Sequence, residues 1–386
     1  MIRVLHAGDP GEAGRRLDFQ GVSRADRTRL VRDLRSYLFC IPEGEAAPAL
    51  PALLARWKIP SAWGKGMLFF SVSSVDQLDE WMSEGEEARI ALAQAGKAIR
   101  RYLAKDFIVP CRGRELRLGG SPSIMGILNV TPDSFSDGGK YRSAEAAVRR
   151  GREMTEEGAG IIDVGGESTR PGSLPVPAGE EIARVAPVIR ELARETAALL
   201  SVDTTKAVVA RAAIDAGAHM VNDTSALADD PEMAGVVGES GCAVVLMHRR
   251  GTPATMQRSP HYDSLFDEML DELRERIAAA EGAGIPGERI LVDPGVGFGK
   301  RFEDNLTLHR HLPDLRNLGR PVVFGPSRKA FIGRITGKEA PGRIFGTAAS
   351  IAFAASLGAH VLRVHDVKEM KEVLQVVSAI REGAEC

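Results

Sequence analysis

From residue 124 onward, short apolar runs alternate with longer segments in which apolar residues recur at helical spacing. The runs are rich in β-branched side chains, which is typical of buried parallel strands. The longer segments, residues 144–157, 180–196, 206–216 and 264–280 among them, predict amphipathic helices. The expected strands are residues 124–130, 161–165, 199–204, 219–223, 243–248, 290–293, 321–325 and 361–365.

This alternation predicts right-handed β-α crossovers and a parallel sheet. Repeats spread over about 260 residues favour a closed (β/α)8 TIM barrel over an open sheet, because such barrels usually contain about 250 residues. The last helix, residues 366–381, would cover the eighth strand. Active sites of these barrels lie at the carboxyl ends of the strands, so we expect the chemistry there.

The first part of the chain, residues 1–106, breaks this alternation and predicts a small α+β module; residues 107–386 form the barrel domain. The module lacks clustered polar chemistry, which favours a scaffolding or oligomer-contact role over catalysis. Residues 108–118 predict a hairpin with its turn at Arg112-Gly113, and we expect it to plug the N-terminal face of the barrel. In the module we expect strands at 2–6, 37–41 and 67–72 and helices at 24–35, 47–57 and 84–104.

Composition narrows the function classes. The 386 residues are 44% hydrophobic, with 50 Lys plus Arg against 52 Asp plus Glu. No concentrated basic run is present, which argues against nucleic-acid binding. The sequence shows neither an apolar stretch of about 18 to 20 residues nor a secretory signal, so we expect no membrane association and a cytoplasmic location. The cysteines, Cys40, Cys111, Cys242 and Cys386, lack metal-ligand spacing and are interpreted as ordinary thiols.

Polar and charged residues gather at the ends of the predicted strands. Any one Asp, Asn or Ser there is explained by helix capping or a turn. Capping does not call for Lys, Arg and His beside carboxylates at the same barrel end, so the set together indicates a site. Its members are Asn129, Asp163, Asp203, Asn222, Asp223, His248, Asp293, Ser327, Arg328, Lys329, Arg363 and His365.

The stretch GVGFGK, residues 295–300, is similar to a phosphate loop but fails its pattern. Pro294 stands at the first Gly position and Arg301 at the Ser/Thr position. We interpret it as a glycine-rich turn that lets a ligand approach the backbone, with Phe298 as an apolar lid. The sequence also lacks H-E-x-x-H and G-x-S-x-G, which excludes those metalloprotease and serine-hydrolase classes. The remaining acceptors and cations suit a polar heterocycle that carries an anionic group.

Motifs spread over residues 107–386 resemble those of the dihydropteroate synthases in order and spacing. They are NVTPDSFSDGG (129–139), DVGGESTRPG (163–172), SVDTTK (201–206), HMVNDTSA (219–226), MHRRGTPATMQ (247–257), DPGVGFGK (293–300), GPSRKAFIG (325–333) and RVHDV (363–367). The resemblance implies a (β/α)8 barrel that joins 6-hydroxymethyl-7,8-dihydropterin pyrophosphate to p-aminobenzoate, with Mg2+, in folate biosynthesis. Members of the family are sulfonamide targets. Residues 1–106 lie outside the resemblance.

The resemblance also implies roles for individual residues. The pterin-binding positions are Asp203, Asn222, Met247, Asp293, Phe298, Lys329 and Arg363. The pyrophosphate-binding positions are Asn129, Thr169, Arg363 and His365, and the metal positions are Asn129 and Asp137. The p-aminobenzoate-binding positions are Phe135, Thr169, Arg170, Pro171 and Ala330.

The implied chemistry needs no strong general base, because an aromatic amine is already neutral near pH 7. The difficult step is the loss of pyrophosphate, which metal and basic groups assist electrostatically. The catalytic residues would be Asp203, Lys329, Asp137 and Arg363, with Asp203 stabilising positive charge on the pterin.

Two features depart from the family pattern. Ala330 replaces a common Ser near the aminobenzoate carboxylate, which leaves backbone N–H groups at the helix start to hold the anion. Arg249 and Arg250 replace residues that are often uncharged, and the sequence leaves their role open.

Two other functions compete with this interpretation. A methyltetrahydrofolate:corrinoid methyltransferase shares the barrel and the pterin slot but does not need the S-T-R-P, S-R-K and R-V-H segments around a pyrophosphate. A noncatalytic pterin-binding or scaffolding barrel is the second alternative. The family resemblance also implies a homodimer through the outer helices.

Overall fold

The computed structural model divides the chain into two compact units, which are described separately below. The first comprises Met1–Ala104 with Arg316–Gly319, and the second comprises Lys105–Leu315 with Arg320–Cys386. The structure describes residues 2–6, 17, 21–26, 30, 37–130, 140–168 and 172–383.

The second unit is a parallel barrel. Its sheet has the strand order β12-β11-β10-β9-β8-β7-β14-β13 over the described residues. The ring closes between β12 and β13, where Val292 pairs with Val322 and its N–H donates to the Pro321 carbonyl at 3.0 Å. The strands are β7 (Ser123–Asn129), β8 (Ile161–Gly165), β9 (Leu199–Asp203), β10 (Met220–Asp223), β11 (Ala243–Met247), β12 (Ile290–Asp293), β13 (Val323–Phe324) and β14 (Val361–Val364).

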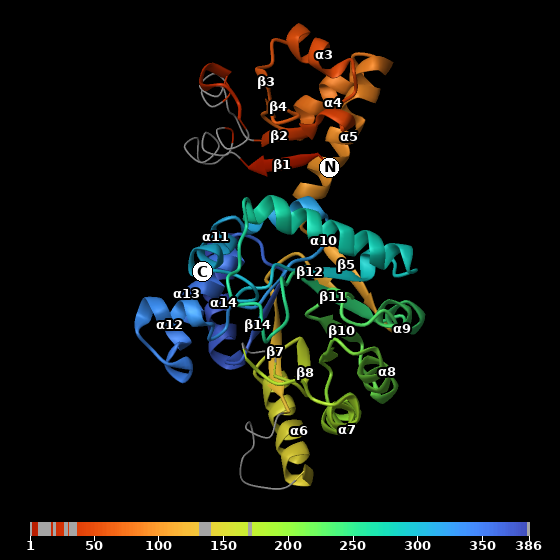
Figure 1. Cartoon of the computed structure of the whole chain (residues 1–386), viewed down its shortest axis with the longest axis vertical. Coiled ribbons are helices and arrows are strands. Elements are labelled where there is room, and N and C mark those ends of the chain that lie inside the picture. Colours follow the sequence, from red (N-terminus) through yellow and green to blue (C-terminus); the bar gives the residue numbers. More distant parts are fainter. Residues whose placement is uncertain are drawn as a thin grey trace. The chain divides into compact units, whose positions relative to one another are not determined.

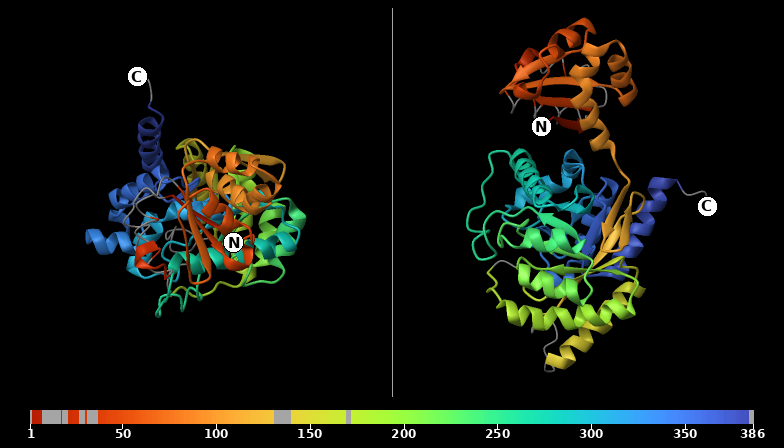
Figure 2. Two further views of the ribbon diagram at one scale, coloured as in Figure 1. Left: turned by 90° about the horizontal axis from the view of Figure 1, so that it is seen from above. Right: turned by 90° about the vertical axis from the view of Figure 1, so that its right-hand side faces the viewer.

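Helices surround this ring, as Figures 1 and 2 show. These helices bury apolar stripes; in α7, for example, Val185, Ile189 and Leu192 recur on one buried stripe. The expected (β/α)8 TIM barrel is thereby confirmed. The helices are α6 (Lys140–Glu156), α7 (Ala178–Glu195), α8 (Ala207–Ala216), α9 (Met233–Ser240), α10 (Leu265–Gly282), α11 (Phe302–Arg310), α12 (Ala330–Thr336), α13 (Ile344–Ser356) and α14 (Val367–Glu382).

A hairpin closes the N-terminal end of the barrel. Its strands β5 (Phe107–Cys111) and β6 (Arg114–Leu118) are joined at Arg112 and Gly113, which have φ values of 47° and 78°. Positive φ at both positions is the requirement of a type I′ turn, so Gly at the second position suits it. The predicted plug is confirmed, because hairpin and strand side chains share one core, called the floor: Val109, Cys111, Leu116, Leu118, Met125, Ile161, Leu199, Met220, Ala243, Val245, Leu291, Val323 and Val361.

The first unit is the expected α+β module. An antiparallel sheet of order β1-β2-β4-β3 carries a large apolar cluster with its helices and a smaller one that includes Leu38, Cys40 and Phe69. Its elements are β1 (Arg3–His6), β2 (Tyr37–Pro42), β3 (Ser61–Gly64), β4 (Met67–Val72), α3 (Leu50–Arg56), α4 (Val75–Ser83) and α5 (Glu86–Leu103).

The module differs from expectation in several places, among them strand β3, which the sequence pattern did not predict. The helix expected at residues 24–35 lies largely outside the described residues. The helix predicted at 84–104 begins only at Glu86, because Gly85 has φ 158° and interrupts it. The preceding helix α4 was not predicted; its Ser74 cap accepts the Gln77 N–H at 3.1 Å. In the described parts of both units, no helix combines the length and apolarity that crossing a bilayer requires.

Candidate active site

Arg363 lies at the centre of the polar end of the barrel. Its Nε donates to Asp163 Oδ2 and its Nη2 to Asp203 Oδ2, each at 2.7 Å. Burial alone would lower the pKa of Arg363, but the two carboxylates outweigh it and raise the pKa. Within the described residues its Nη1 makes no hydrogen bond, so a fixed guanidinium presents a donor to an anion.

Asp163 belongs to the predicted strand-end set, but no role was predicted for it. Its Oδ2 also accepts Asn222 Nδ2 at 2.9 Å. Its side chain is completely buried, and Oδ1 has no partner among the described residues. Asp163 therefore orients both Arg363 and Asn222. Sequence reveals that it is an inward-facing strand residue, but not that its partner lies 200 positions away.

Asp203 and Asp293 are two buried carboxylates at strand ends. Burial raises the pKa of Asp203; Arg363 opposes this shift and Asp163 adds to it. Burial also raises the pKa of Asp293 to about 6, although its Oδ1 accepts the Gly295 N–H at 2.7 Å. Such desolvated acceptors favour a ligand that brings matching donors.

Lys329 and Phe298 form a pair between the loops that follow β13 and β12. Lys329 Nζ lies 4.1 Å from the centroid of the Phe298 ring, a cation–π distance. Phe298 also packs with Met247 and Met256 in a buried cluster. The predicted pterin-wall residues Met247 and Phe298 are thus brought together.

His365 lies beside the loop that follows β13. Its Nδ1 is 2.9 Å from Ser327 Oγ, and its backbone N–H donates to the same hydroxyl at 3.2 Å. Burial, reinforced by Arg328 and Arg363, lowers the pKa of His365 to about 3. The ring is therefore neutral near pH 7 and presents a hydrogen bond rather than a charge.

Asn129 ends β7 beside Asp203. A side chain at Gly165, the residue between them, would place its Cβ 3.6 Å from Asn129 Oδ1 and 3.5 Å from Asp203 Cβ. The absent Cβ leaves this space open. Among the described residues no group of three or more His, Cys, Asp or Glu side chains is arranged to hold a metal.

A cavity of about 340 Å³ adjoins Asp203 on the side of β8 to β11. Two buried polar atoms of its lining, Thr224 Oγ1 and Glu181 Oε1, have no partner within the described residues. Its lining residues are Glu167, Ser173, Pro175, Glu181, Asp203, Thr204, Thr205, Lys206, Thr224, Asp229, Arg249, Thr252, Pro253 and Ala254.

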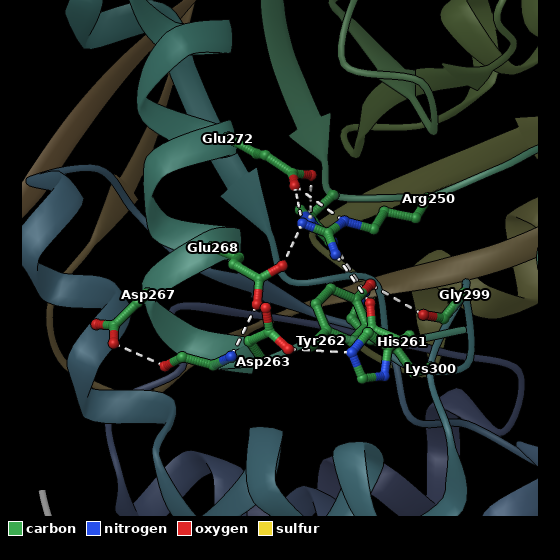
Figure 3. Close-up of polar contacts among 11 residues, drawn as sticks. Arg250, His261, Tyr262, Asp263, Asp267, Glu268, Glu272, Gly299 and Lys300 are labelled. Atoms are coloured by element: carbon green, nitrogen blue, oxygen red, sulfur yellow. Dashed lines mark hydrogen bonds and ion pairs between the residues drawn. The ribbon is translucent and has the colours of Figure 1, made fainter. Parts of the chain in front are cut away.

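The adjacent residues Arg249 and Arg250 form ion pairs with acidic side chains. Arg249 Nη2 lies 2.7 Å from Asp229 Oδ2, which joins the loops after β10 and β11. Arg250 contacts Glu268 and Glu272 of α10, as Figure 3 shows. Arg250 therefore faces α10, whereas Arg249 also lines the cavity beside Asp203.

The remaining predicted positions are divided between two groups. Ala330 is described and is the first residue of α12, directly after Lys329. The others lie outside the described residues: Phe135, Asp137, Thr169, Arg170 and Pro171.

Comparison with known proteins points to one family. The profile described as "Pterin binding enzyme" matches residues 125–365. The dihydropteroate synthase of Synechocystis is 45% identical over 258 residues, which are 67% of this chain and 89% of the relative. That of Escherichia coli K12 is also 45% identical, over 67% of this chain and 91% of the relative.

Solved structures agree with these relatives. The Xanthomonas albilineans dihydropteroate synthase with 4-aminobenzoic acid is 49% identical with a TM-score of 0.68, covering 72% of this chain and 98% of the other. The Yersinia pestis enzyme in a sulfonamide complex is 41% identical with a TM-score of 0.68, covering 72% and 100%. The similarity therefore spans almost the whole of each relative.

Proposed function

The chain belongs to the dihydropteroate synthases, transferases of the pterin-binding enzyme family, and from that premise we propose how its residues perform the reaction. The substrates are 6-hydroxymethyl-7,8-dihydropterin pyrophosphate and p-aminobenzoate, and the products are 7,8-dihydropteroate and pyrophosphate. The observation that carries the assignment is Arg363, fixed between Asp163 and Asp203 among the strand ends.

The pterin lies in the slot formed by Asp203, Asn222, Asp293, Lys329, Met247, Phe298 and Arg363. Asp293 accepts donors from the amino-pyrimidine edge, and its buried carboxylate favours a ligand that supplies them. A ligand that lacks the donors would leave this acceptor unpaired, at a cost of about 1–3 kcal/mol. One face of the flat ring packs against Met247 and Phe298, and the other face packs against the guanidinium of Arg363.

The pyrophosphate lies near Asn129, Thr169, Arg363 and His365. Arg363 supplies its Nη1 donors, and the neutral His365 donates a hydrogen bond from Nε2 while Nδ1 faces Ser327. Asn129 offers an amide oxygen, a hard ligand of the type that Mg2+ accepts, and Asp137 is the proposed second ligand. When bound, Mg2+ would neutralise charge on the departing pyrophosphate.

Bond cleavage precedes bond formation in the proposed mechanism. The methylene C–O bond breaks toward pyrophosphate, and the resulting positive charge spreads into the pterin ring. Asp203 stabilises that charge, while Arg363 and Lys329 stabilise the leaving anion. The neutral aromatic amine then forms the C–N bond and releases a proton.

The aminobenzoate site uses Phe135, Thr169, Arg170, Pro171 and Ala330. Ala330 directly follows Lys329, so the second substrate lies next to the pterin slot. With no hydroxyl at this position, the carboxylate is held by backbone N–H groups and Arg170. This arrangement predicts binding without the side-chain bond that a Ser would supply.

The barrel pairs with a second copy through its outer helices. Phe345 and Phe353 of α13 and Val376 and Ile380 of α14 are exposed large apolar side chains, and these two helices pack together. Such a patch is typical of protein contacts. Light scattering should give a dimer, and Phe345→Arg should shift it toward monomer.

We assign catalysis to residues 107–386 and a noncatalytic role to residues 1–106. A protein that lacks residues 1–106 should keep its turnover, measured as dihydropteroate formed per barrel. Loss of turnover in a folded truncated protein would place part of the site in the module.

One assay separates this function from its two alternatives. Purified protein with both substrates and Mg2+ should release pyrophosphate and form dihydropteroate, and omission of either substrate should abolish product. Tight binding of methyltetrahydrofolate without turnover would instead favour a corrinoid methyltransferase. Pterin binding with neither activity would favour a noncatalytic barrel.

A further inference from the structure

Behind the Phe298 wall lies a lysine that the proposed mechanism does not use. Lys300 is 3% exposed, and its Nζ lies 2.8 Å from His248 Nδ1 and 3.0 Å from the Phe298 carbonyl oxygen. Burial lowers the pKa of Lys300 to about 7, against the opposing charges of Asp293, Asp304 and Glu272. A buried ammonium is costly unless its hydrogen bonds are satisfied, and here one of them is directed at the backbone of the wall residue.

His248 continues the contact toward α10. Its Nε2 lies 2.9 Å from Glu272 Oε2, and its side chain is 2% exposed. Because Nδ1 faces the Lys300 amine and Nε2 faces a carboxylate, the neutral ring carries its proton on Nε2. Burial, aided by Lys300, lowers the pKa of His248 to about 4, which keeps that neutral form near pH 7.

Arg250 and Tyr262 hold the same segment from a second direction. Arg250 Nε donates to Glu272 Oε1 at 2.9 Å, and its guanidinium carbon lies 4.3 Å from the Tyr262 ring centroid. The Tyr262 hydroxyl donates to the Gly299 carbonyl at 2.9 Å. Figure 3 shows Arg250 between the two glutamates of α10, with Tyr262, Gly299 and Lys300 on its other side.

Consecutive carbonyls, those of Phe298 and Gly299, are therefore held by buried donors. Gly299 has φ 61°, and a Cβ there would lie 2.6 Å from the Arg250 carbonyl oxygen, so the segment also packs closely against the β11 loop. Lys329 covers the Phe298 ring. The network thus connects the outer helix α10 to one wall of the slot.

We propose that Lys300 is a positioning residue of the pterin slot: with His248 and Glu272 it fixes the backbone of Phe298 and thereby sets the distance between the aromatic wall and the bound ring. This inference rests on the proposed place of Phe298 in the slot. Lys300 touches no reacting atom and acts through Phe298. Its loss should weaken pterin binding more than it slows the chemical step.

The test compares Lys300→Met, which keeps length and removes the donor, with Arg289→Met as a matched control. Arg289 is another buried cation; it donates to the carbonyls of Cys242 and Gly238, each at 3.4 Å, at the opposite end of β12. In full-length protein Lys300→Met should raise KM for the pterin substrate about 10- to 100-fold, equivalent to about 1.4–2.8 kcal/mol of binding free energy. Its kcat should fall less than its KM rises. Arg289→Met should lower thermal stability and leave KM unchanged.

A second variant keeps the proposal testable if Lys300→Met does not fold. Glu272→Gln changes a partly exposed residue of α10 outside the slot and should raise the same KM in the same direction. A folded Lys300→Met protein, or a folded Glu272→Gln protein, with the wild-type pterin KM would overturn the proposal. Phe298→Ala distinguishes failure of the proposed slot from failure of the positioning role. An unchanged pterin KM in Phe298→Ala would contradict the proposed slot. A raised KM in Phe298→Ala, together with a wild-type KM in Lys300→Met, would contradict only the positioning role.

Discussion

The two ends of the barrel use the same strands for different purposes. At the N-terminal end, Leu199 and Leu291 pack against the β5–β6 hairpin, and the floor consists of apolar side chains. Farther along those strands Asp203 and Asp293 are also buried but have ionisable side chains. Burial therefore stabilises the fold at one end, while at the other it raises carboxylate pKa values and prepares acceptors for a ligand. Stability and function should be separable by the position of a substitution along a strand.

The largest expected effect is on the floor. Leu291→Ala removes a completely buried side chain two residues before Asp293 and should lower the free energy of unfolding by about 2–5 kcal/mol. Denaturant titration measures this loss. The pterin KM of the folded fraction should stay at the wild-type value; a large rise would show that floor and site are not separable.

At the polar end, Asp203→Asn should lower turnover rather than the free energy of unfolding. It removes the charge that stabilises the developing cation, so kcat should fall about 100- to 1,000-fold. Pterin binding should weaken far less, and steady-state kinetics with direct binding measurements distinguish the two. Asp215→Asn, an exposed carboxylate on α8, is the control. Equal losses in ground-state and transition-state binding would remove Asp203 from its catalytic role.

The partly buried His365 of the polar end predicts a pH dependence. The folded pKa of His365, about 3, lies below its unfolded value of about 6.5, so its stabilising contribution is present above pH 6.5 and is lost as the pH falls toward 3. When the pH is lowered from 7 to 5, the free energy of unfolding of the wild type should fall by about 2 kcal/mol more than that of His365→Gln. His261→Gln, at an exposed histidine, should not reproduce this difference. Parallel pH curves for wild type and His365→Gln would contradict it.

The smallest effect concerns the second substrate. Ala330→Ser adds a hydroxyl beside the proposed aminobenzoate carboxylate. One additional hydrogen bond should strengthen p-aminobenzoate binding by about 0.5–1.5 kcal/mol and lower its KM accordingly. Sulfonamide inhibition should strengthen in parallel. A rise in the KM for p-aminobenzoate and in the sulfonamide inhibition constant would show that the position is too crowded for the added oxygen.

Sequence pattern predicted the barrel because buried parallel strands require apolar runs, and the carboxyl-end rule then located the polar cluster. The element boundaries were less predictable. The strand expected at 321–325 contains only Val323–Phe324, because neighbouring residues close the ring through a single bridge instead of a longer ladder. Strand β3, with an exposed Trp63 in its short span, was not recognised.

Long-range partners explain what pattern reasoning missed at the site. Asp163 was visible as a strand-end residue, but its role depends on Arg363 and Asn222. Lys300 belongs to a motif rejected as a phosphate loop, and its buried amine meets His248, which is 52 positions earlier. Neither contact leaves a local spacing signal. Asp223, in contrast, has the turn role that is typical of a single Asp at a strand end, because it accepts the Ser225 and Leu227 N–H groups.

The most direct test of the separation between floor and polar end is the affinity of Asp293→Asn for the pterin pyrophosphate, measured by calorimetry without p-aminobenzoate. The variant keeps the shape of the side chain but exchanges one acceptor oxygen for a donor. We predict a Kd at least about 10-fold higher than that of the wild type, equivalent to about 1.4 kcal/mol, with a melting temperature that stays close to the wild-type value. An unchanged Kd, or a loss of affinity that only accompanies unfolding, would contradict the account.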